Sequence, residues 1–296
     1  MQSKVSHEIE RKKYNFIPKI VMQTWKTEGM SSEWSDCRES LQVSLPSDWQ
    51  YVFMTDFAMY SFVKFAFPEL FDDFLRLPYG VQRADIFRYL WLYAYGGLYL
   101  DLDYKIHKPF VHFLEAINSP LIVIYSANMK SVLTNSIIAA KPGLPLLLEL
   151  AKASLKRPYG RWFSFTKHIQ IMTSTGPLAF NDAIKDSNIP YTILPQKLFL
   201  SSSPILRDFN TETGFMSATE GGSWNSGDTI FFNFINKYKL FVTVFFSIII
   251  LMKVLDAYIT KLTLDQLISR LKKSVRKTNS KLIETVRGVI STAEAM

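Results

Sequence analysis

Residues 84–103 read ADIFRYLWLYAYGGLYLDLD, and this stretch decides the fold of the chain. From Gly80 to Tyr95, apolar side chains recur at helical spacing on one side, which predicts a helix. The residues expected on that side are Val81, Ala84, Phe87, Leu90, Trp91 and Ala94. Gly96-Gly97 predicts the end of the helix, because glycine readily adopts positive φ. Leu98–Leu100 then predicts a short buried strand that runs directly into Asp101.

Segments on both sides of this stretch alternate between strand and helix character. Strands are predicted over residues 17–25, 49–54 and 121–125, and a helix over residues 145–155. Thr55-Asp56 predicts the cap of a helix that follows the second strand. Strands that alternate with helices indicate an α/β layered domain with a mostly parallel sheet.

Two carboxylates, Asp101 and Asp103, follow the predicted strand at its carboxyl end, where open α/β sheets collect their ligands. Such a pair is suited to hold Mg²⁺ or Mn²⁺ and thereby neutralise the diphosphate that leaves a nucleotide sugar. Asp85 and Arg88 on the preceding helix add a charged pair. The alternatives are a solvated turn and an aspartyl-phosphate phosphatase site, but Tyr104 stands where such phosphatases need Thr or Val.

The composition narrows the chemistry further. Of the 296 residues 48% are hydrophobic, which is enough for a sizeable core. The single cysteine, Cys37, allows neither an internal disulfide nor a cysteine-based zinc cluster. The net charge is +8, of which +5 lies in residues 253–296, where nine Lys/Arg face four Asp/Glu. The rest of the chain is nearly neutral, so its charge gives no support to nucleic-acid binding.

The character of the sequence changes near residue 230. Leu240–Met252 is an uninterrupted apolar run of 13 residues, shorter than the about 20 residues of a full span, but lysines flank it and can extend to the interface. It predicts a membrane-spanning segment, with an in-plane segment or a buried core helix as alternatives. The basic amphipathic tail that follows suits an anionic membrane surface or, alternatively, an ordinary solvated helix.

The chain therefore divides into four predicted parts: a polar lead-in (1–15), the α/β domain (16–230), a hydrophobic membrane segment (231–256) and a basic helical tail (257–296). The positive tail predicts a cytosolic carboxyl terminus, which would place the α/β domain in the lumen if the segment spans. The polar first residues and the absence of an Asn-x-Ser/Thr sequon favour a cytosolic domain instead.

Residues 84–89 and 92–103 closely resemble the DXD sugar-binding segment of glycosyltransferase family 32. That family includes the yeast-type initiating α-1,6-mannosyltransferases and the inositol phosphorylceramide mannosyltransferases. Further landmarks of the resemblance are Ile17–Ile20, Gln23–Lys26, Asn135, Lys141–Gly143 and Thr175–Pro177. The resemblance covers about residues 16–230 and implies a GT-A-like fold, dependence on Mn²⁺ or Mg²⁺, and transfer with retention of anomeric configuration.

The resemblance also implies roles for individual residues. Asp101 and Asp103 would bind the metal and the donor, with Arg88 at the donor sugar or phosphate. Asp85 would hydrogen-bond donor hydroxyls, and Trp25 would stack on the nucleobase. The alternatives are that Trp25 belongs to the core and that Asp85 and Arg88 form only a helical i, i+3 pair.

The remaining metal ligand departs from the family pattern, because no histidine precedes Gly221-Gly222-Ser223-Trp224. Glu220 and Asn225 are the candidates, since both carry oxygen ligands, and Glu220 is slightly favoured. Trp224 is expected at the donor site.

The sequence as a whole predicts a membrane-associated retaining hexosyltransferase of an ER- or Golgi-type membrane. It would move mannose or another hexose from a GDP- or UDP-sugar to a lipid-linked or glycan acceptor. The alternative is a membrane-tethered carbohydrate-binding protein of the same fold without turnover.

Overall fold

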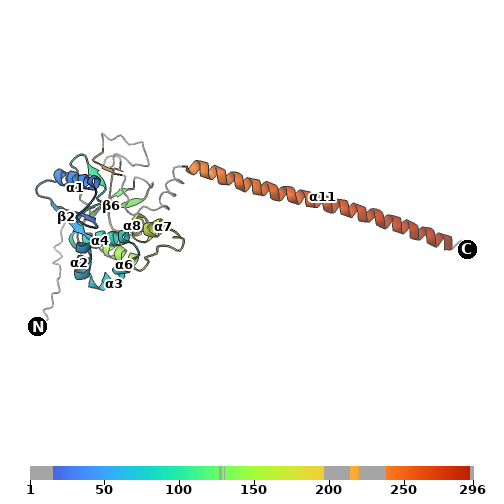
Figure 1. Ribbon diagram of the computed structural model, residues 1–296, viewed down its shortest axis with the longest axis horizontal. Coiled ribbons are helices and arrows are strands. Elements are labelled where there is room, and N and C mark those ends of the chain that lie inside the picture. Colours follow the sequence, from blue (N-terminus) through green and yellow to red (C-terminus); the bar gives the residue numbers. More distant parts are fainter. Residues whose placement is uncertain (1–15, 127–128, 130, 197–213, 220–237, 294–296) are drawn as a thin grey trace. The chain divides into compact units, whose positions relative to one another are not determined.

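The computed structural model of the protein describes residues 16–126, 129, 131–196, 214–219 and 238–293. The chain divides into two compact units, Met1–Phe231 and Phe232–Met296. The described strands all lie in the first unit, and the described residues of the second unit form a long helix (Figure 1).

The first unit alternates strands and helices, as predicted. Its elements in chain order are β1 (Ile20–Trp25), α1 (Ser32–Ser44), β2 (Gln50–Thr55), α2 (Asp56–Ala66), α3 (Pro68–Leu75), α4 (Gly80–Tyr95), β3 (Gly97–Leu100), β4 (Tyr104–Ile106), α5 (Val111–Ala116), β5 (Leu121–Tyr125), β6 (Leu133–Ala140), α6 (Pro145–Leu155), α7 (Lys167–Ser174), α8 (Pro177–Lys185), β7 (Thr192–Leu194) and β8 (Met216–Ala218).

Six strands form the main sheet in the order β2-β1-β3-β6-β5-β7. The pairs β1–β2, β1–β3 and β5–β7 are parallel, whereas β6 runs antiparallel to both of its neighbours. Five of these six described strands therefore point the same way, which confirms the mostly parallel sheet. Strands β4 and β8 pair separately as a small antiparallel sheet.

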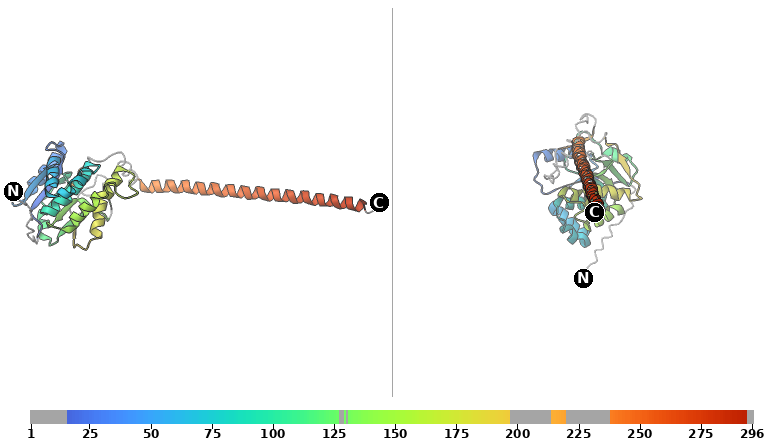
Figure 2. Two further views of the ribbon diagram at one scale, coloured as in Figure 1. Left: turned by 90° about the horizontal axis from the view of Figure 1, so that it is seen from below. Right: turned by 90° about the vertical axis from the view of Figure 1, so that its right-hand side faces the viewer.

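Alternating side chains of the main sheet build two hydrophobic cores, one on each face. Tyr99 packs with α2, α3, α4, α6 and α8, whereas its neighbours Leu98 and Leu100 pack with α1, α5 and the small sheet. Figures 1 and 2 show helices on both faces of the sheet. This arrangement follows from the period of two along a strand, because successive side chains point to opposite faces.

Helix α4 has the predicted bounds and is buried on more than one side. Every residue from Asp85 to Leu92 is buried, whereas Val81 and Ala84 are only half-buried. The reason is that α4 packs against β3 and β6 on one side and against α2, α3, α6 and α7 on others. An enclosed helix has no solvent face, so its polar residues Asp85 and Arg88 must find partners inside the protein.

Two glycines connect α4 to β3, as predicted. Gly96 and Gly97 have φ of 68° and 91°. A Cβ atom on Gly97 would lie 2.4 Å from the carbonyl oxygen of Ile20 in β1. The turn therefore needs both the positive φ and the missing side chain, and it sets β3 directly beside β1.

The second unit contains α11 (Lys239–Ala293), a continuous helix of 55 residues. It includes the predicted apolar run and continues past the predicted boundary at residue 256. Within the described residues, Lys239–Arg276 is the one helix long and apolar enough to cross a membrane. This assignment rests on the length and the composition of the helix.

Candidate active site

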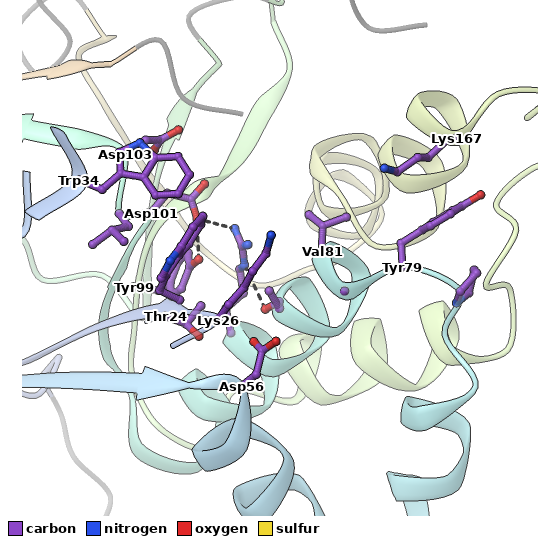
Figure 3. Close-up of a pocket in the computed structure, with 16 residues that line it drawn as sticks. Thr24, Lys26, Trp34, Asp56, Tyr79, Val81, Tyr99, Asp101, Asp103 and Lys167 are labelled. Atoms are coloured by element: carbon purple, nitrogen blue, oxygen red, sulfur yellow. Dashed lines mark hydrogen bonds and ion pairs between the residues drawn. The ribbon is translucent and has the colours of Figure 1, made fainter. Parts of the chain in front are cut away.

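A cavity of about 380 Å³ opens where β1 and β3 end and α4 begins. It lies outside the carboxyl ends of parallel strands, the position expected for a ligand in an α/β sheet. The lining residues are Thr24, Trp25, Lys26, Trp34, Asp56, Pro78, Tyr79, Gly80, Val81, Ala84, Arg88, Tyr99, Asp101, Leu102, Asp103 and Lys167 (Figure 3). Of the predicted site residues, the structure thus brings Trp25, Arg88, Asp101 and Asp103 to one cavity.

The backbone around the two carboxylates is held from several elements. The amide of Asp101 donates to the carbonyl of Ser136 at 2.8 Å, and Gln23 Nε2 donates to the Asp101 carbonyl at 3.3 Å. Thr219 donates to the Asp103 carbonyl from its amide at 2.8 Å and from its hydroxyl at 3.1 Å. These bonds tie the Asp101–Asp103 turn to β1, β6 and the residue after β8.

Arg88 is buried beneath the cavity and joins two carboxylates. Its guanidinium lies 3.1 Å from Asp101 Oδ1 and 3.0 Å from Asp85 Oδ1, and it donates to the Asn135 carbonyl at 2.7 Å. Burial lowers the pKa of Arg88, but Asp101, Tyr99 and Asp85 raise it, and the net pKa lies above its ordinary value. Arg88 is therefore a fixed positive charge directly behind Asp101.

Asp85 is buried among protein partners. It is 4% exposed, is not among the residues that line the cavity, and both of its oxygens have protein partners. Oδ1 accepts from Asn135 at 2.9 Å in addition to Arg88, and Oδ2 accepts from Thr175 at 2.7 Å. Burial raises the pKa of Asp85, while Arg88 and Thr175 act against that shift. The i, i+3 pair of Asp85 and Arg88 thus forms, and a direct contact of Asp85 with a donor stays a prediction.

Asp101 and Asp103 differ in their electrostatics. The Asp101 side chain is 31% exposed, and its Oδ1 accepts from the Tyr99 hydroxyl at 2.5 Å. Burial and the nearby negative charge of Asp101 raise the pKa of Asp103 to about 7. When Asp85, Asp101 and Asp103 are all ionised, they exceed the charge of Arg88 by two negative charges, which suits one divalent cation.

Two tryptophans form the wall beside the carboxylates. Trp25 at the end of β1 and Trp34 in α1 meet edge to face, with ring centroids 3.9 Å apart. Trp25 is half-buried and lines the cavity, and Lys26 Nζ lies 5.5 Å from its ring centroid. The wall therefore offers aromatic surface next to a positive charge.

The predicted residues near Trp224 cannot be placed in this geometry. Glu220, Trp224 and Asn225 lie outside the described residues. Within the part of the chain that is described, no group of three or more His, Cys, Asp or Glu side chains could hold a metal. The two carboxylates of the Asp-x-Asp motif supply the hard oxygen ligands that Mg²⁺ and Mn²⁺ prefer, so the residues present fit such an ion.

Sequence reasoning gave no role to several residues that build the site. Tyr99, Trp34, Asn135 and Thr175 all contact a predicted site residue directly. The contact of Tyr99 with Asp101 could be predicted from the sequence, because strand residues two apart share a face and Tyr99 precedes Asp101 by two residues. The others come from distant segments and become neighbours only through the fold.

Known proteins with a similar sequence include glycosyltransferases. Residues 31–122 match the family described as glycosyltransferase sugar-binding region containing DXD motif. The chain is 29% identical to inositol phosphoceramide mannosyltransferase 3 of Schizosaccharomyces pombe, over 81% of this chain and 68% of that protein. It is 32% identical to the mannosyl phosphorylinositol ceramide synthase SUR1 of Saccharomyces cerevisiae, over 73% of this chain and 54% of that protein.

Among solved structures, a PaToxG glycosyltransferase aligns with 57% of this chain and 69% of that one, at 16% identity and a TM-score of 0.40. The chain spans about half to two thirds of the length of the curated relatives named above. The motif and the matched region agree: the chain belongs to the glycosyltransferase family defined by a sugar-binding region with a DXD motif.

Proposed function

We propose that the chain is a metal-dependent retaining mannosyltransferase that transfers mannose from a nucleotide sugar to the hydroxyl of a lipid-linked acceptor. The observation that carries this proposal is the meeting of Asp101, Asp103, Arg88 and Trp25 at one cavity. The names of the relatives support mannose as the sugar and an inositol-phosphate sphingolipid as the acceptor. The alternatives are a glycan as the acceptor and a hexose other than mannose as the transferred sugar.

Asp101 and Asp103 would hold Mn²⁺ or Mg²⁺, which when bound neutralises charge on the donor diphosphate. Arg88 keeps Asp101 in place through a 3.1 Å contact, and its buried charge favours the developing negative charge on the leaving group. Asp85 is a positioning residue, because it fixes the guanidinium of Arg88 from below at 3.0 Å. Trp25, with Trp34 and Lys26, would receive the nucleobase and its ribose.

The third protein ligand stays a prediction. Thr219 immediately precedes Glu220 in the sequence and bonds twice to the Asp103 carbonyl. This link supports Glu220 over Asn225 as the ligand, because Glu220 follows directly on a residue fixed to the motif.

A donor screen tests the function. Full-length protein is incubated with Mn²⁺ and each of a panel of GDP- and UDP-hexoses, and released nucleotide is measured with and without inositol phosphorylceramide. We expect turnover with a GDP- or UDP-hexose, strongest with the mannose donor, and an NMR spectrum of the product that shows retained configuration. The double variant Asp101→Ala/Asp103→Ala should lose turnover and Mn²⁺ dependence.

The matched control is Asp72→Ala/Asp73→Ala, which removes two carboxylates from α3 outside the cavity. It should keep wild-type turnover. Donor binding by calorimetry without hydrolysis or transfer to any acceptor would support the binding protein instead of the enzyme. Full activity of the Asp101→Ala/Asp103→Ala variant would reject the assigned site.

For localisation, we propose an endomembrane of ER or Golgi type, with α11 as the anchor. The support is the length and apolar composition of Lys239–Arg276. Protease digestion of sealed membranes decides the orientation: a protected α/β domain indicates a lumenal active site, and a digested one indicates a cytosolic active site. Release of the protein by alkaline carbonate would contradict a spanning helix.

A further inference from the structure

The connection between α6 and α7, residues 156–166, exposes an unusual amount of aromatic surface. We name it the aromatic loop. The side chains of Tyr159, Trp162 and Phe165 are 64%, 88% and 80% exposed. A cluster of large exposed apolar side chains on a soluble domain marks an interaction surface, because each costs free energy while it faces water.

Hydrogen bonds hold the aromatic loop in a defined conformation although its aromatic side chains are exposed. The amide of Gly160 donates to the Arg157 carbonyl at 2.9 Å, and the Ser164 amide donates to the Arg161 carbonyl at 2.9 Å. The Ser164 hydroxyl lies 2.8 Å from that of Thr173 in α7, and Gln170 Nε2 donates to the Ser164 carbonyl at 3.1 Å. The loop is thus fixed to α7 while its aromatic rings point away from the core.

The surroundings of the aromatic rings are positive. The sequence contains no Asp or Glu between Ala151 and Asn181, but five Lys or Arg between Ala151 and His168. Arg161 pairs with Asp182 at 2.6 Å. Within the described residues, no carboxylate lies at ion-pair distance from Lys156 or Arg157. A partner of this surface must therefore supply negative charge as well as apolar groups.

The aromatic loop leads directly into the cavity. Lys167, the first residue after it, lines the cavity and lies 5.4 Å from the ring centroid of Tyr79, which also lines it. The Tyr79 hydroxyl donates to Gln170 Oε1 at 3.1 Å. Figure 3 shows Tyr79 and Lys167 together on the far side of Val81 from Asp101. The cavity therefore has a carboxylate end and a separate cationic end beside the loop.

We propose that the aromatic loop rests on an anionic lipid surface, with Trp162 and Phe165 in the interfacial layer. The Lys167 end of the cavity then receives the anionic head group of a lipid acceptor from that surface; this second step rests on the proposed function. Trp and Phe among basic side chains favour a negatively charged bilayer interface. A protein partner is the less favoured occupant, because a bilayer matches the mixed aromatic and cationic loop without requiring a shaped apolar groove.

Fluorescence quenching tests the insertion independently of catalysis. Full-length protein is reconstituted in vesicles of phosphatidylcholine and phosphatidylinositol, with and without bromine on the acyl chains. We expect brominated lipid to quench wild-type emission, and Trp162→Phe to remove one quenchable component while it keeps an aromatic ring in the loop. Equal quenched intensity in the two proteins would place Trp162 outside the lipid and overturn the proposal.

Charge and kinetics complete the test. Lys156→Gln/Arg157→Gln should reduce the quenching of Trp162 in phosphatidylinositol vesicles, and Lys64→Gln in α2 is the control. Trp162→Ser/Phe165→Ser should raise the KM for the lipid acceptor about tenfold, because two apolar side chains no longer hold the site at the surface.

The rate of donor hydrolysis without acceptor should be unchanged in Trp162→Ser/Phe165→Ser. The control is Phe65→Ser, at a residue on α2 that is 78% exposed. This control should change neither the KM for the lipid acceptor nor the rate of donor hydrolysis. If the wild-type protein hydrolysed no donor, the proposed function would be contradicted, but the insertion of the aromatic loop into lipid would not. An unquenched Trp162, together with a loop-dependent change in oligomeric mass, would assign the loop to a protein interface and reject the lipid.

Discussion

The hydroxyl of Tyr99 donates to Oδ1 of Asp101 at 2.5 Å, and the guanidinium of Arg88 lies over the same ring at 4.3 Å from its centroid. One buried side chain therefore orients the first motif carboxylate and supports the cation behind it. Burial raises the pKa of Tyr99 well above its ordinary value, with Arg88 acting against that shift. The hydroxyl thus remains a hydrogen-bond donor throughout the physiological pH range.

Tyr99→Phe isolates the hydrogen bond, because it keeps the ring beneath Arg88 and removes only the hydroxyl. We expect kcat/KM to fall about tenfold and the free energy of unfolding to fall by about 1 kcal/mol. Steady-state kinetics with the best donor and urea unfolding measure the two effects. Tyr95→Phe, at a ring that is 45% exposed, is the control and should change neither. An unchanged kcat/KM in Tyr99→Phe would show that Asp101 needs no support from Tyr99.

Arg88→Met tests the buried charge network. The Asp85 and Arg88 side chains are each 5% exposed, so loss of the guanidinium leaves Asp85 buried without its cation. We expect the free energy of unfolding to fall by about 3–5 kcal/mol. Adding Asp85→Asn should restore part of that loss, because the unpaired charge is then removed as well.

Arg76→Met is the matched control, since Arg76 pairs with Asp73 at the surface and is 72% exposed. Its cost should stay below about 1 kcal/mol. Equal losses in Arg76→Met and Arg88→Met, measured by urea unfolding, would contradict an energetic role for the buried pair.

The pKa of Asp103 predicts a dependence on pH. Burial, with a further contribution from Asp101, raises this pKa to about 7, whereas an unfolded aspartate has a pKa of about 3.9. The folded protein therefore binds the extra proton between these values, and its stability without metal falls as the pH rises through that window. Mn²⁺ affinity should change in the opposite sense and rise with pH up to about 7, because the metal needs the ionised carboxylate.

Asp103→Asn should reduce the pH dependence of both the stability without metal and the Mn²⁺ affinity. Unfolding by urea in a chelating buffer and calorimetric titration with Mn²⁺, each from about pH 5.5 to about pH 8, measure them. Asp186→Asn, at an exposed residue after α8, is the control. Wild-type stability that stays level across this range would show that Asp103 titrates at an ordinary pKa.

Local patterns predicted much of this fold. The bounds of α4, β5 and α6 follow from apolar spacing and glycine or proline punctuation, and the structure confirms them. Strand β6 was missed, although the Ser136 carbonyl in it accepts the amide of Asp101. Its position between β3 and β5 is set by pairing between distant segments, which no local pattern encodes.

The same limit applies to the site. Asp101 and Asp103 are adjacent in sequence to the strand that positions them, so their place in the cavity could be predicted. The burial of Asp85 could not, because it depends on Asn135 and Thr175 from β6 and the end of α7. A short motif thus identifies the chemistry of a site, whereas the partners that determine exposure and pKa come from tertiary packing.

Gly97→Ala tests the turn that delivers the motif. Gly97 has a φ of 91°, and a Cβ there would lie 2.4 Å from the backbone oxygen of Ile20. The clash is with backbone and cannot be relieved by rotating a side chain, so β3 must move away from β1. We expect a loss of at least about 3 kcal/mol of unfolding free energy and weaker Mn²⁺ binding, since Asp101 follows β3 directly.

Gly143→Ala is a closely matched control, because Gly143 has a φ of 74° but no atom lies within 4 Å of its added Cβ. Its cost should therefore be the backbone strain alone, about 1 kcal/mol, with Mn²⁺ binding unchanged. Urea unfolding and calorimetry on both variants separate strain from steric clash. If the two glycines proved equally costly, contact between β1 and β3 would not determine the position of the motif, and the dependence of the metal site on this turn would have to be abandoned.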